Sequence, residues 1–407
     1  MSLKKDLLKY QPRKEQQECI DFIDAEYKKN KENKFFLLNL PVGTGKSHLA
    51  LMIADWYLKN VNGNAKFDVI TNSKILQDQY VETYESINDL KGKENYECAQ
   101  YSCSCAQGAE FNRLNKTSCE SCPYSNARES YISGGVSLTN FYLYILYAMY
   151  NPKLMESRDS RVLIVDEAHR LKMKSGMFKN LGENQVKEII KTAKTSVFFI
   201  DEAQKVTWSD VGEISMIEEQ AKLAGALVER LELTSQFRCS GSDDYMSWLD
   251  ETLGVGAGSD HYFSPEKFDF QIFDNPLEMH NKIKEKNKIN NKSRVVAGYC
   301  WDWISQKRPD LKDITIDAFG YKATWNLASD GSEWIISPRS VEEVGCIHTC
   351  QGLEVDYVGV IIGRDLVAID GVLKTDPSAR AKTDASLKGY KKELKEDPIG
   401  AELKADE

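Results

Sequence analysis

A glycine-rich turn near the start of this 407-residue chain could bind phosphate. Residues 40–47 read LPVGTGKS, between an apolar run and a helical pattern. Glycines let successive backbone N–H groups face a phosphate, the lysine adds positive charge, and the serine hydroxyl can bind Mg2+. Leu40 stands where such a loop usually begins with glycine. An ordinary structural turn is the alternative, and the strand–turn–helix context favours a nucleotide site made by Gly43, Thr44, Gly45, Lys46 and Ser47.

Two acidic pairs could complete a hydrolytic site. Asp166 and Glu167 follow the apolar run 162–165, and Asp201 and Glu202 follow the run 196–200. At the end of a strand beside the phosphate loop, the aspartate can hold Mg2+ and the glutamate can orient or deprotonate a water molecule. An acidic helix start is the ordinary alternative. Because one phosphate loop uses one such pair, we expect Asp166 and Glu167 to serve it, with the second pair as the alternative.

Cysteines are concentrated in one polar segment. Five of the ten lie between positions 98 and 122, spaced C-x4-C-x-C-x13-C-x2-C. A segment rich in Ser, Asn, Gln and Gly packs a core poorly, but four thiolates on one metal centre could hold it together. Chance clustering of loop thiols is the alternative, and CxxC pairs suit zinc as well as an iron–sulfur cluster. The pattern predicts a metal-binding insert at about 91–130.

The elements that would position these residues alternate between strand and helix. Apolar runs at 35–40, 67–71, 136–139, 162–165 and 196–200 predict strands, and 48–59 predicts an amphipathic helix. This alternation is typical of an α/β fold with a parallel sheet. Residues 277–294 predict a solvated helix or linker, and strands return between 294 and 363. We therefore expect a nucleotide-binding lobe at 1–172, a segment with the second acidic pair at 173–290, a second α/β lobe at 291–370 and a loose tail at 371–407.

Composition limits where a partner could bind. Hydrophobic residues make up 42% and charged residues 28% of the chain, which is typical of folded proteins. The net charge of −9 argues against attachment of the whole surface to nucleic acid or to a membrane. The longest apolar run, 141–150, is too short for a membrane helix, and the first residues carry no signal-peptide core. We expect a soluble cytoplasmic protein without a membrane partner, in which any phosphate-binding surface is local.

Residues 10 to about 172 resemble the first motor domain of the iron–sulfur superfamily 2 DNA helicases of the XPD/DinG type. The resemblance rests on RKEQ, LPVGTGKS, VITNSKILQDQY, the cysteine insert followed by CPYSNAR, SLTN and VLIVDEAH, in that order. It implies a P-loop, RecA-like lobe with ATP and Mg2+ on Lys46 and Ser47. It also implies a 4Fe-4S cluster, with zinc as the alternative. For the nucleotide it implies Arg13 and Gln16 near the base. For the cluster it implies four ligands, with Cys103 as the substitute for one of them: Cys98, Cys105, Cys119 and Cys122.

From about residue 177 the resemblance changes. SVFFIDEAQKVTWSDVG, LELTSQFRCSGSDDYMSWLD and GCIHTCQGLEVDYVGVIIG resemble an uncharacterised bacterial P-loop helicase-like family found near schlafen-like and nuclease domains. In that family DEAQ is the Mg2+-binding box, QFRC presents an arginine to the γ phosphate, and TCQGLE contacts nucleotide and strand. These roles would fall to Asp201 and Glu202, Arg238, and Gln351, Gly352 and Glu354. Two families in one chain suggest a composite with a junction near 172–177. The alternative is one divergent family, in which the second acidic pair is an ordinary acidic strand end.

The leading functional hypothesis is an ATP-dependent DNA helicase or translocase that moves on single-stranded or forked DNA; RNA is not excluded. Thr71, Asn72 and Gln351 are the positions expected to face nucleic acid. The alternative is a protein that binds nucleotide and nucleic acid but unwinds little or nothing, because its motor is composite and truncated. An arginine finger contributes about 10^3 to 10^5 in rate, and Arg238 is the one obvious candidate for that role.

Overall fold

The computed structural model divides the chain into two compact units: Met1–Lys205 with Ser209–Arg238, and Val206–Trp208 with Cys239–Glu407. The structure describes residues 11–30, 34–41, 43–72, 74–84, 87–119, 121–150, 161–174, 183–193, 195–204, 210–233, 243–254, 268–306, 308, 310–326, 334–335, 337–346, 355–384, 387 and 390–401. The expected site residues Arg238, Gln351, Gly352 and Glu354 lie outside these ranges. Each unit is described by itself below.

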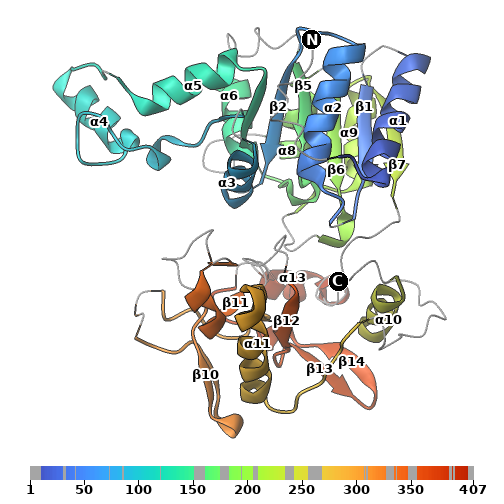
Figure 1. The fold of residues 1–407 in the computed structure, drawn as a ribbon, viewed down its shortest axis with the longest axis vertical. Coiled ribbons are helices and arrows are strands. Elements are labelled where there is room, and N and C mark those ends of the chain that lie inside the picture. Colours follow the sequence, from blue (N-terminus) through green and yellow to red (C-terminus); the bar gives the residue numbers. More distant parts are fainter. Residues whose placement is uncertain are drawn as a thin grey trace. The chain divides into compact units, whose positions relative to one another are not determined.

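The first unit is a parallel sheet with helices in the connections (Figure 1). Its strands are β1 (Lys34–Asn39), β2 (Lys66–Thr71), β3 (Asn88–Asp89), β4 (Val136–Asn140), β5 (Arg161–Val165), β6 (Thr195–Ile200) and β7 (Leu227–Glu232). Its helices are α1 (Lys14–Lys29), α2 (Lys46–Asn60), α3 (Lys74–Thr83), α4 (Cys105–Asn115), α5 (Pro123–Ser133), α6 (Phe141–Tyr150), α8 (Gln185–Ile190) and α9 (Ile214–Leu223). The short helices η2 (Lys93–Asn95), η3 (Ala168–Arg170) and η5 (Glu202–Gln204) lie between them.

Strand order brings the phosphate loop and both acidic pairs to one edge of the sheet. The order is β3-β4-β2-β5-β6-β1-β7, and every pairing is parallel. In register, Asn39 of β1 lies opposite Ile200 of β6, and Val165 of β5 lies opposite Phe198. The loops after β1, β5 and β6 therefore leave the sheet at the same edge, where open α/β sheets bind ligands.

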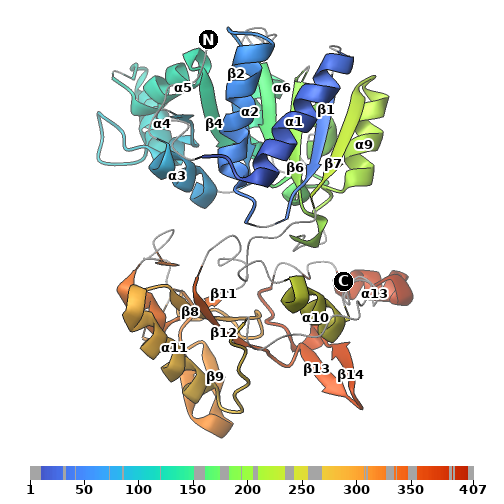
Figure 2. The same ribbon diagram turned by 45° about the vertical axis from the view of Figure 1, so that its right-hand side comes forward.

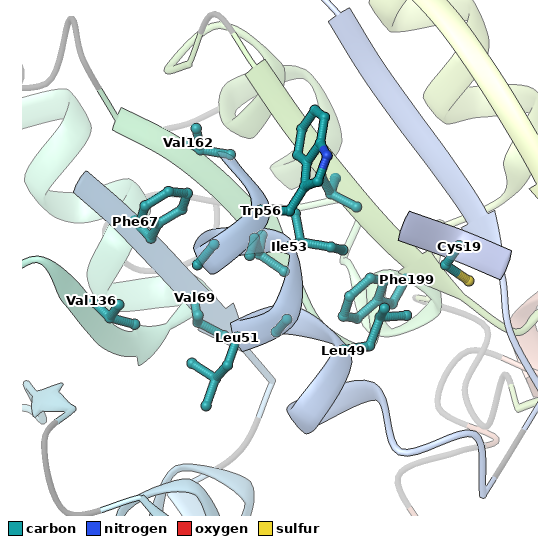
Figure 3. Packing of buried hydrophobic residues seen from close by; sticks show 14 of the residues in the cluster. Cys19, Leu49, Leu51, Ile53, Trp56, Phe67, Val69, Val136, Val162 and Phe199 are labelled. Carbon is teal, nitrogen blue, oxygen red and sulfur yellow. The ribbon is translucent and has the colours of Figure 1, made fainter. Parts of the chain in front are cut away.

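Side-chain alternation along the strands builds two hydrophobic layers. Phe36 and Leu38 of β1 pack with residues of α1 and α2, whereas Phe35 and Leu37 pack with residues of α6, α8 and α9. Successive strand residues point to opposite faces, so a strand buried on both faces is apolar throughout. Figure 2 shows α1 and α2 lying along the same face of the sheet, and Figure 3 shows the side chains that fill the layer beneath them.

The second unit is built around a small parallel sheet. In it, β8 (Ser293–Ala297) lies between β11 (Val344–Cys346) and β12 (Tyr357–Ile361), and α11 (Pro276–Asn290) packs on this sheet through Met279 and Ile283. The antiparallel pairs are β9 (Ile314–Ile316) with β10 (Tyr321–Ala323), and β13 (Leu366–Ile369) with β14 (Val372–Thr375). The helices α10 (Asp243–Leu253) and α13 (Tyr390–Glu396) and the short helices η7 (Asp317–Phe319), η9 (Pro338–Glu342) and η10 (Pro377–Ala379) complete it.

The α/β class with a parallel sheet is confirmed. Residue 172 lies inside the first unit, and β5 and β6, from either side of it, are hydrogen-bonded neighbours. Within the segment 371–407, for which a loose tail is expected, β14 pairs with β13, and Arg380 forms ion pairs with two aspartates.

Among the residues that the structure describes, none of the helices combines the length and apolar character that crossing a membrane requires.

Candidate nucleotide site

The phosphate loop has the backbone geometry that its glycines predict. Gly43 and Gly45 have positive φ angles of 88° and 72°, and Gly45 is the N-cap of α2, which begins at Lys46. Side chains with a Cβ rarely adopt this left-handed conformation, so glycine is required at both turns. Thr44 is buried, and its hydroxyl donates to Pro41 O at 3.0 Å. The loop is therefore a closed turn with a helix N-terminus behind it, which is a suitable cradle for phosphate.

Arg13 and Gln16 hold this loop through its carbonyl groups. The Gln16 amide donates to Thr44 O at 2.9 Å and Gly45 O at 3.1 Å, and its oxygen accepts from Arg13 N at 3.0 Å. Arg13 donates from its guanidinium to Gly43 O at 2.7 Å. A Cβ on Gly45 would lie only 2.6 Å from Gln16 Nε2, so the two segments are in close contact. In this conformation the Gln16 amide is engaged with the loop rather than directed at a base.

The acidic pair after β5 lies next to the phosphate loop, with Asp166 buried and Glu167 partly buried. Asp166 accepts hydrogen bonds from Tyr80 Oη at 2.9 Å and from Glu167 N at 3.0 Å. Burial raises the pKa of Asp166, and the positive charge of Lys46 opposes that shift. Burial, and then the charge of Asp166, raise the pKa of Glu167 to about 7, while Arg170 and Lys46 lower it. Lys46 thus lies within electrostatic reach of both carboxylates.

Glu167 is held in a strained backbone conformation. Its φ of 58° places a residue with a side chain in the left-handed region, where such strain is common at functional sites. The backbone of Asn72 acts to lower the pKa of its carboxylate. Among the described residues its buried Oε2 has no hydrogen-bond partner, which leaves an acceptor for a further group.

The second acidic pair is used differently. Glu202 Oε1 accepts from Ile214 N at 2.8 Å and so caps the start of α9. Asp201 Oδ2 accepts from Gln204 Nε2 at 2.5 Å. Although β6 is the immediate neighbour of β1, both carboxylates make local contacts that stabilise the turn and helix after the strand.

Thr71 and His169 lie beneath the surface of the site. Thr71 is fully buried, so its side chain does not present itself to a nucleic acid in this conformation, whereas Asn72 is partly exposed. Burial, with the charges of Lys46 and Arg170, lowers the pKa of His169 to about 3, so the imidazole is neutral. Within the described part of the chain, neither ring nitrogen of His169 has a hydrogen-bond partner.

Tyr80 is the residue at this site that sequence reasoning missed. It lies on α3 within the segment VITNSKILQDQY. Its hydroxyl donates to Asp166, and Ser47 lies close enough to lower its pKa. The position of Tyr80 in the sequence could have indicated this role. It lies on the helix that follows β2, and β2 is the neighbour of β5, the strand that leads to Asp166.

The cysteine insert does not assemble the expected ligand set. Cys105 and Cys122 lie with their sulfurs 3.2 Å apart, but Cys119 is exposed and accepts a hydrogen bond from Asn112. Cys98 lies beside Cys103, the reserve ligand, because Cys98 N donates to Cys103 O at 2.9 Å. Throughout the described residues, which include all five cysteines, no three or more His, Cys, Asp or Glu side chains are arranged to hold a metal. The expected 4Fe-4S or zinc site at Cys98, Cys105, Cys119 and Cys122 is therefore not supported.

The side chains near Ser47 offer oxygen atoms that could bind Mg2+. Mg2+ prefers hard oxygen ligands and usually takes one or two carboxylates with phosphate and water. Ser47 offers a hydroxyl and Asp166 a carboxylate, and the buried Glu167 Oε2 without a partner lies next in the chain. These oxygens fit a magnesium–nucleotide site.

One protein-family model matches most of the chain. The sequence model for the Schlafen group 3, DNA/RNA helicase domain, matches residues 41–405, on both sides of 172–177. An uncharacterised protein of Saccharomyces cerevisiae is 26% identical over 227 residues, 50% of this chain and 49% of that protein. The chain thus spans about half the length of that curated relative.

Two solved structures share a more distant similarity. The helicase domain of Hef from Pyrococcus furiosus is 11% identical and covers 89% of this chain and 91% of its own, with a TM-score of 0.38. The SWI2/SNF2 ATPase core of Sulfolobus solfataricus, in complex with double-stranded DNA, is 11% identical. The match covers 89% of this chain and 90% of that chain, with a TM-score of 0.31.

The family match also includes residues 41–172, whose motifs resemble the iron–sulfur helicases of the XPD/DinG type. Because a single family match covers most of the chain, this protein belongs to the Schlafen group 3 DNA/RNA helicase domain family.

Proposed function

We propose that this protein is an ATP-dependent motor that couples ATP hydrolysis to movement on single-stranded or forked DNA, or on RNA. The observation that carries the proposal is the proximity of Lys46 in the phosphate loop to Asp166 and Glu167 at the end of β5. Family membership supports a nucleic-acid motor, because the matching family is a helicase domain.

The residues of the chain divide the work of hydrolysis. The backbone of residues 43–46 and the Lys46 ammonium bind the β and γ phosphates, while Arg13 and Gln16 keep the loop in shape. Ser47 and Asp166 would hold Mg2+, which when bound neutralises charge on the phosphates. Glu167 orients the attacking water and accepts its proton, a task for which a pKa near 7 is well matched.

We assign this role to Asp166 and Glu167 rather than to Asp201 and Glu202. The first pair is buried near Lys46, whereas Glu202 is exposed and caps α9. We also infer a single-family protein rather than a composite. Neighbouring strands of one sheet come from both sides of residues 172–177, and one family match crosses them.

Lys46→Ala tests the proposal. Loss of the ammonium removes the charge that binds the β and γ phosphates, so we expect ATP hydrolysis to fall to background both with and without single-stranded DNA or RNA. Steady-state phosphate release measures the rate, and Lys59→Ala, a lysine at the far end of α2, is the matched control. Hydrolysis retained in Lys46→Ala would refute the nucleotide site. Binding of a strand by a wild-type protein that does not hydrolyse ATP would favour the binding-protein alternative.

A further inference from the structure

Tyr80 links the two halves of the nucleotide site. Its side chain is 1% exposed, and its hydroxyl donates to Asp166 Oδ2 at 2.9 Å. Ser47 lies close enough to the same hydroxyl to lower the pKa of Tyr80, against the effect of burial. The Tyr80 phenol therefore lies between the phosphate loop after β1 and the acidic pair after β5, two strands separated in the sheet by β6.

The bond from Tyr80 fixes the direction of the Asp166 carboxylate. Asp166 Oδ1 is held by Glu167 N at 3.0 Å, and Oδ2 is held by Tyr80. With one donor on each oxygen, rotation of the carboxylate costs a hydrogen bond to a charged group in a buried place.

The helix that carries Tyr80 is itself anchored to the base of the cysteine insert. Gln77 donates to Asp89 Oδ1 at 2.8 Å and to Leu90 O at 3.3 Å, and Asp78 forms an ion pair with Lys91. Lys74 Nζ donates to Asn95 Oδ1 at 2.5 Å. These four polar contacts hold α3 in place, and with it the Tyr80 side chain.

We propose that Tyr80 is a positioning residue that sets the orientation of the Asp166 carboxylate, beside the Ser47 hydroxyl, for a magnesium–nucleotide complex. The inference rests on the proposed function of the site. Tyr80 acts through Asp166. Without the Tyr80 hydroxyl, Asp166 Oδ2 loses its donor, and only the bond from Glu167 N still orients the carboxylate.

The competing interpretation is a core tyrosine whose hydroxyl is satisfied by a nearby carboxylate. Under that interpretation the hydroxyl contributes to stability alone. Tyr84 provides the matched control because it is a buried tyrosine one helical turn further along and bonds His48 Nδ1 at 3.3 Å instead of the acidic pair. Tyr80→Phe and Tyr84→Phe each delete one buried hydroxyl from the same region.

The test measures the affinity of the full chain for a fluorescent ATP analogue as Mg2+ is titrated. We expect Tyr80→Phe to need about tenfold more Mg2+ for half-maximal tight binding, and to bind the metal-free analogue as the wild type does. Tyr84→Phe should follow the wild-type curve. Thermal unfolding of each variant is recorded, and binding is compared well below the lowest midpoint.

The outcomes separate the two levels of inference. An unchanged Mg2+ requirement in Tyr80→Phe, or an equal shift in Tyr84→Phe, overturns the positioning role while leaving the nucleotide site intact. If the wild type itself binds the analogue without any dependence on Mg2+, the proposed function fails first. A fall in kcat with little change in KM for Tyr80→Phe supports positioning, because it shows a loss confined to the reacting geometry.

Discussion

Glu167 combines three properties that suit a general base. Its backbone is strained at a φ of 58°, one carboxylate oxygen is buried without a partner among the described residues, and its pKa is raised to about 7. Burial is the main cause of the raised pKa, because the charged carboxylate is poorly solvated at this position. Glu202 is exposed instead, and it caps a helix.

Substitution of the two glutamates should separate their roles. We expect Glu167→Gln to lower the rate of ATP hydrolysis by about 10^2 to 10^4, because the amide cannot accept the proton of the attacking water. Glu202→Gln keeps a carbonyl that can accept from Ile214 N, so its rate should stay close to that of the wild type. Phosphate release in the presence of a single strand measures both. Equal, small losses would exclude both glutamates from catalysis.

The raised pKa of Glu167 also predicts how stability varies with pH. The unfolded chain loses this proton near its ordinary pKa of 4.5, and the folded chain loses it near 7. The folded state binds more protons within this window, so the contribution of Glu167 to the free energy of unfolding falls as pH rises and levels off above about pH 7.

Glu167→Gln cannot titrate, so it serves as the reference for this effect. Between about pH 5 and pH 8 we expect the variant to gain roughly 1 to 3 kcal/mol of stability relative to the wild type. Urea unfolding at several pH values measures the difference. A constant difference across the range would show that Glu167 does not titrate with a raised pKa.

At the scale of elements, two helix starts in the insert bring a pair of thiols together. Cys105 is the first residue of α4, and Cys122 is the N-cap of α5. Burial raises the pKa of Cys105 to about 11. Burial also acts to raise the pKa of Cys122, but hydrogen bonds from Ser125 and Cys105 leave it lowered. Cys122 is therefore the better nucleophile of the two.

Mild oxidation should join this pair. With glutathione disulfide as the oxidant, the Cys122 thiolate attacks it and releases one glutathione; Cys105 then displaces the second, which leaves a Cys105–Cys122 disulfide. We expect peptide mass spectrometry to find this bond in the wild type and in Cys119→Ser, and not in Cys122→Ser. A disulfide involving Cys119 in the wild type would contradict the arrangement of α4 and α5.

At the scale of the whole molecule, the net charge of −9 limits how a strand can be held. Because the surface as a whole repels phosphate, we expect only a few local contacts with the strand. Each phosphate contact releases counterions, so the salt dependence of binding grows with the number of contacts. For about three phosphate contacts on a single strand, the logarithm of the binding constant should fall with the logarithm of salt concentration with a slope of about −2. Fluorescence anisotropy between low and physiological salt measures it. A slope several times steeper would indicate an extended basic surface.

Much of this protein follows from local sequence. The apolar runs predict β1, β2, β4, β5 and β6, and LPVGTGKS predicts a turn with positive φ at its glycines. These features depend on neighbouring residues alone: side-chain alternation, glycine freedom and the start of a helix. The cysteine spacing, by contrast, predicts four ligands at one centre. The structure leaves Cys119 exposed against Asn112, because spacing along a chain does not determine where loops turn.

The sequence by itself determined the α/β class, the phosphate loop and the presence of two acidic pairs. Only the tertiary structure decided what surrounds each pair: β5 brings Asp166 and Glu167 into a buried place near Lys46, and β6 leads Glu202 to the start of α9. It also decided that Gln16 holds the loop and that Tyr80 donates to Asp166. The reason is that strand order and helix packing are set by contacts between residues far apart in the chain, which no local pattern encodes.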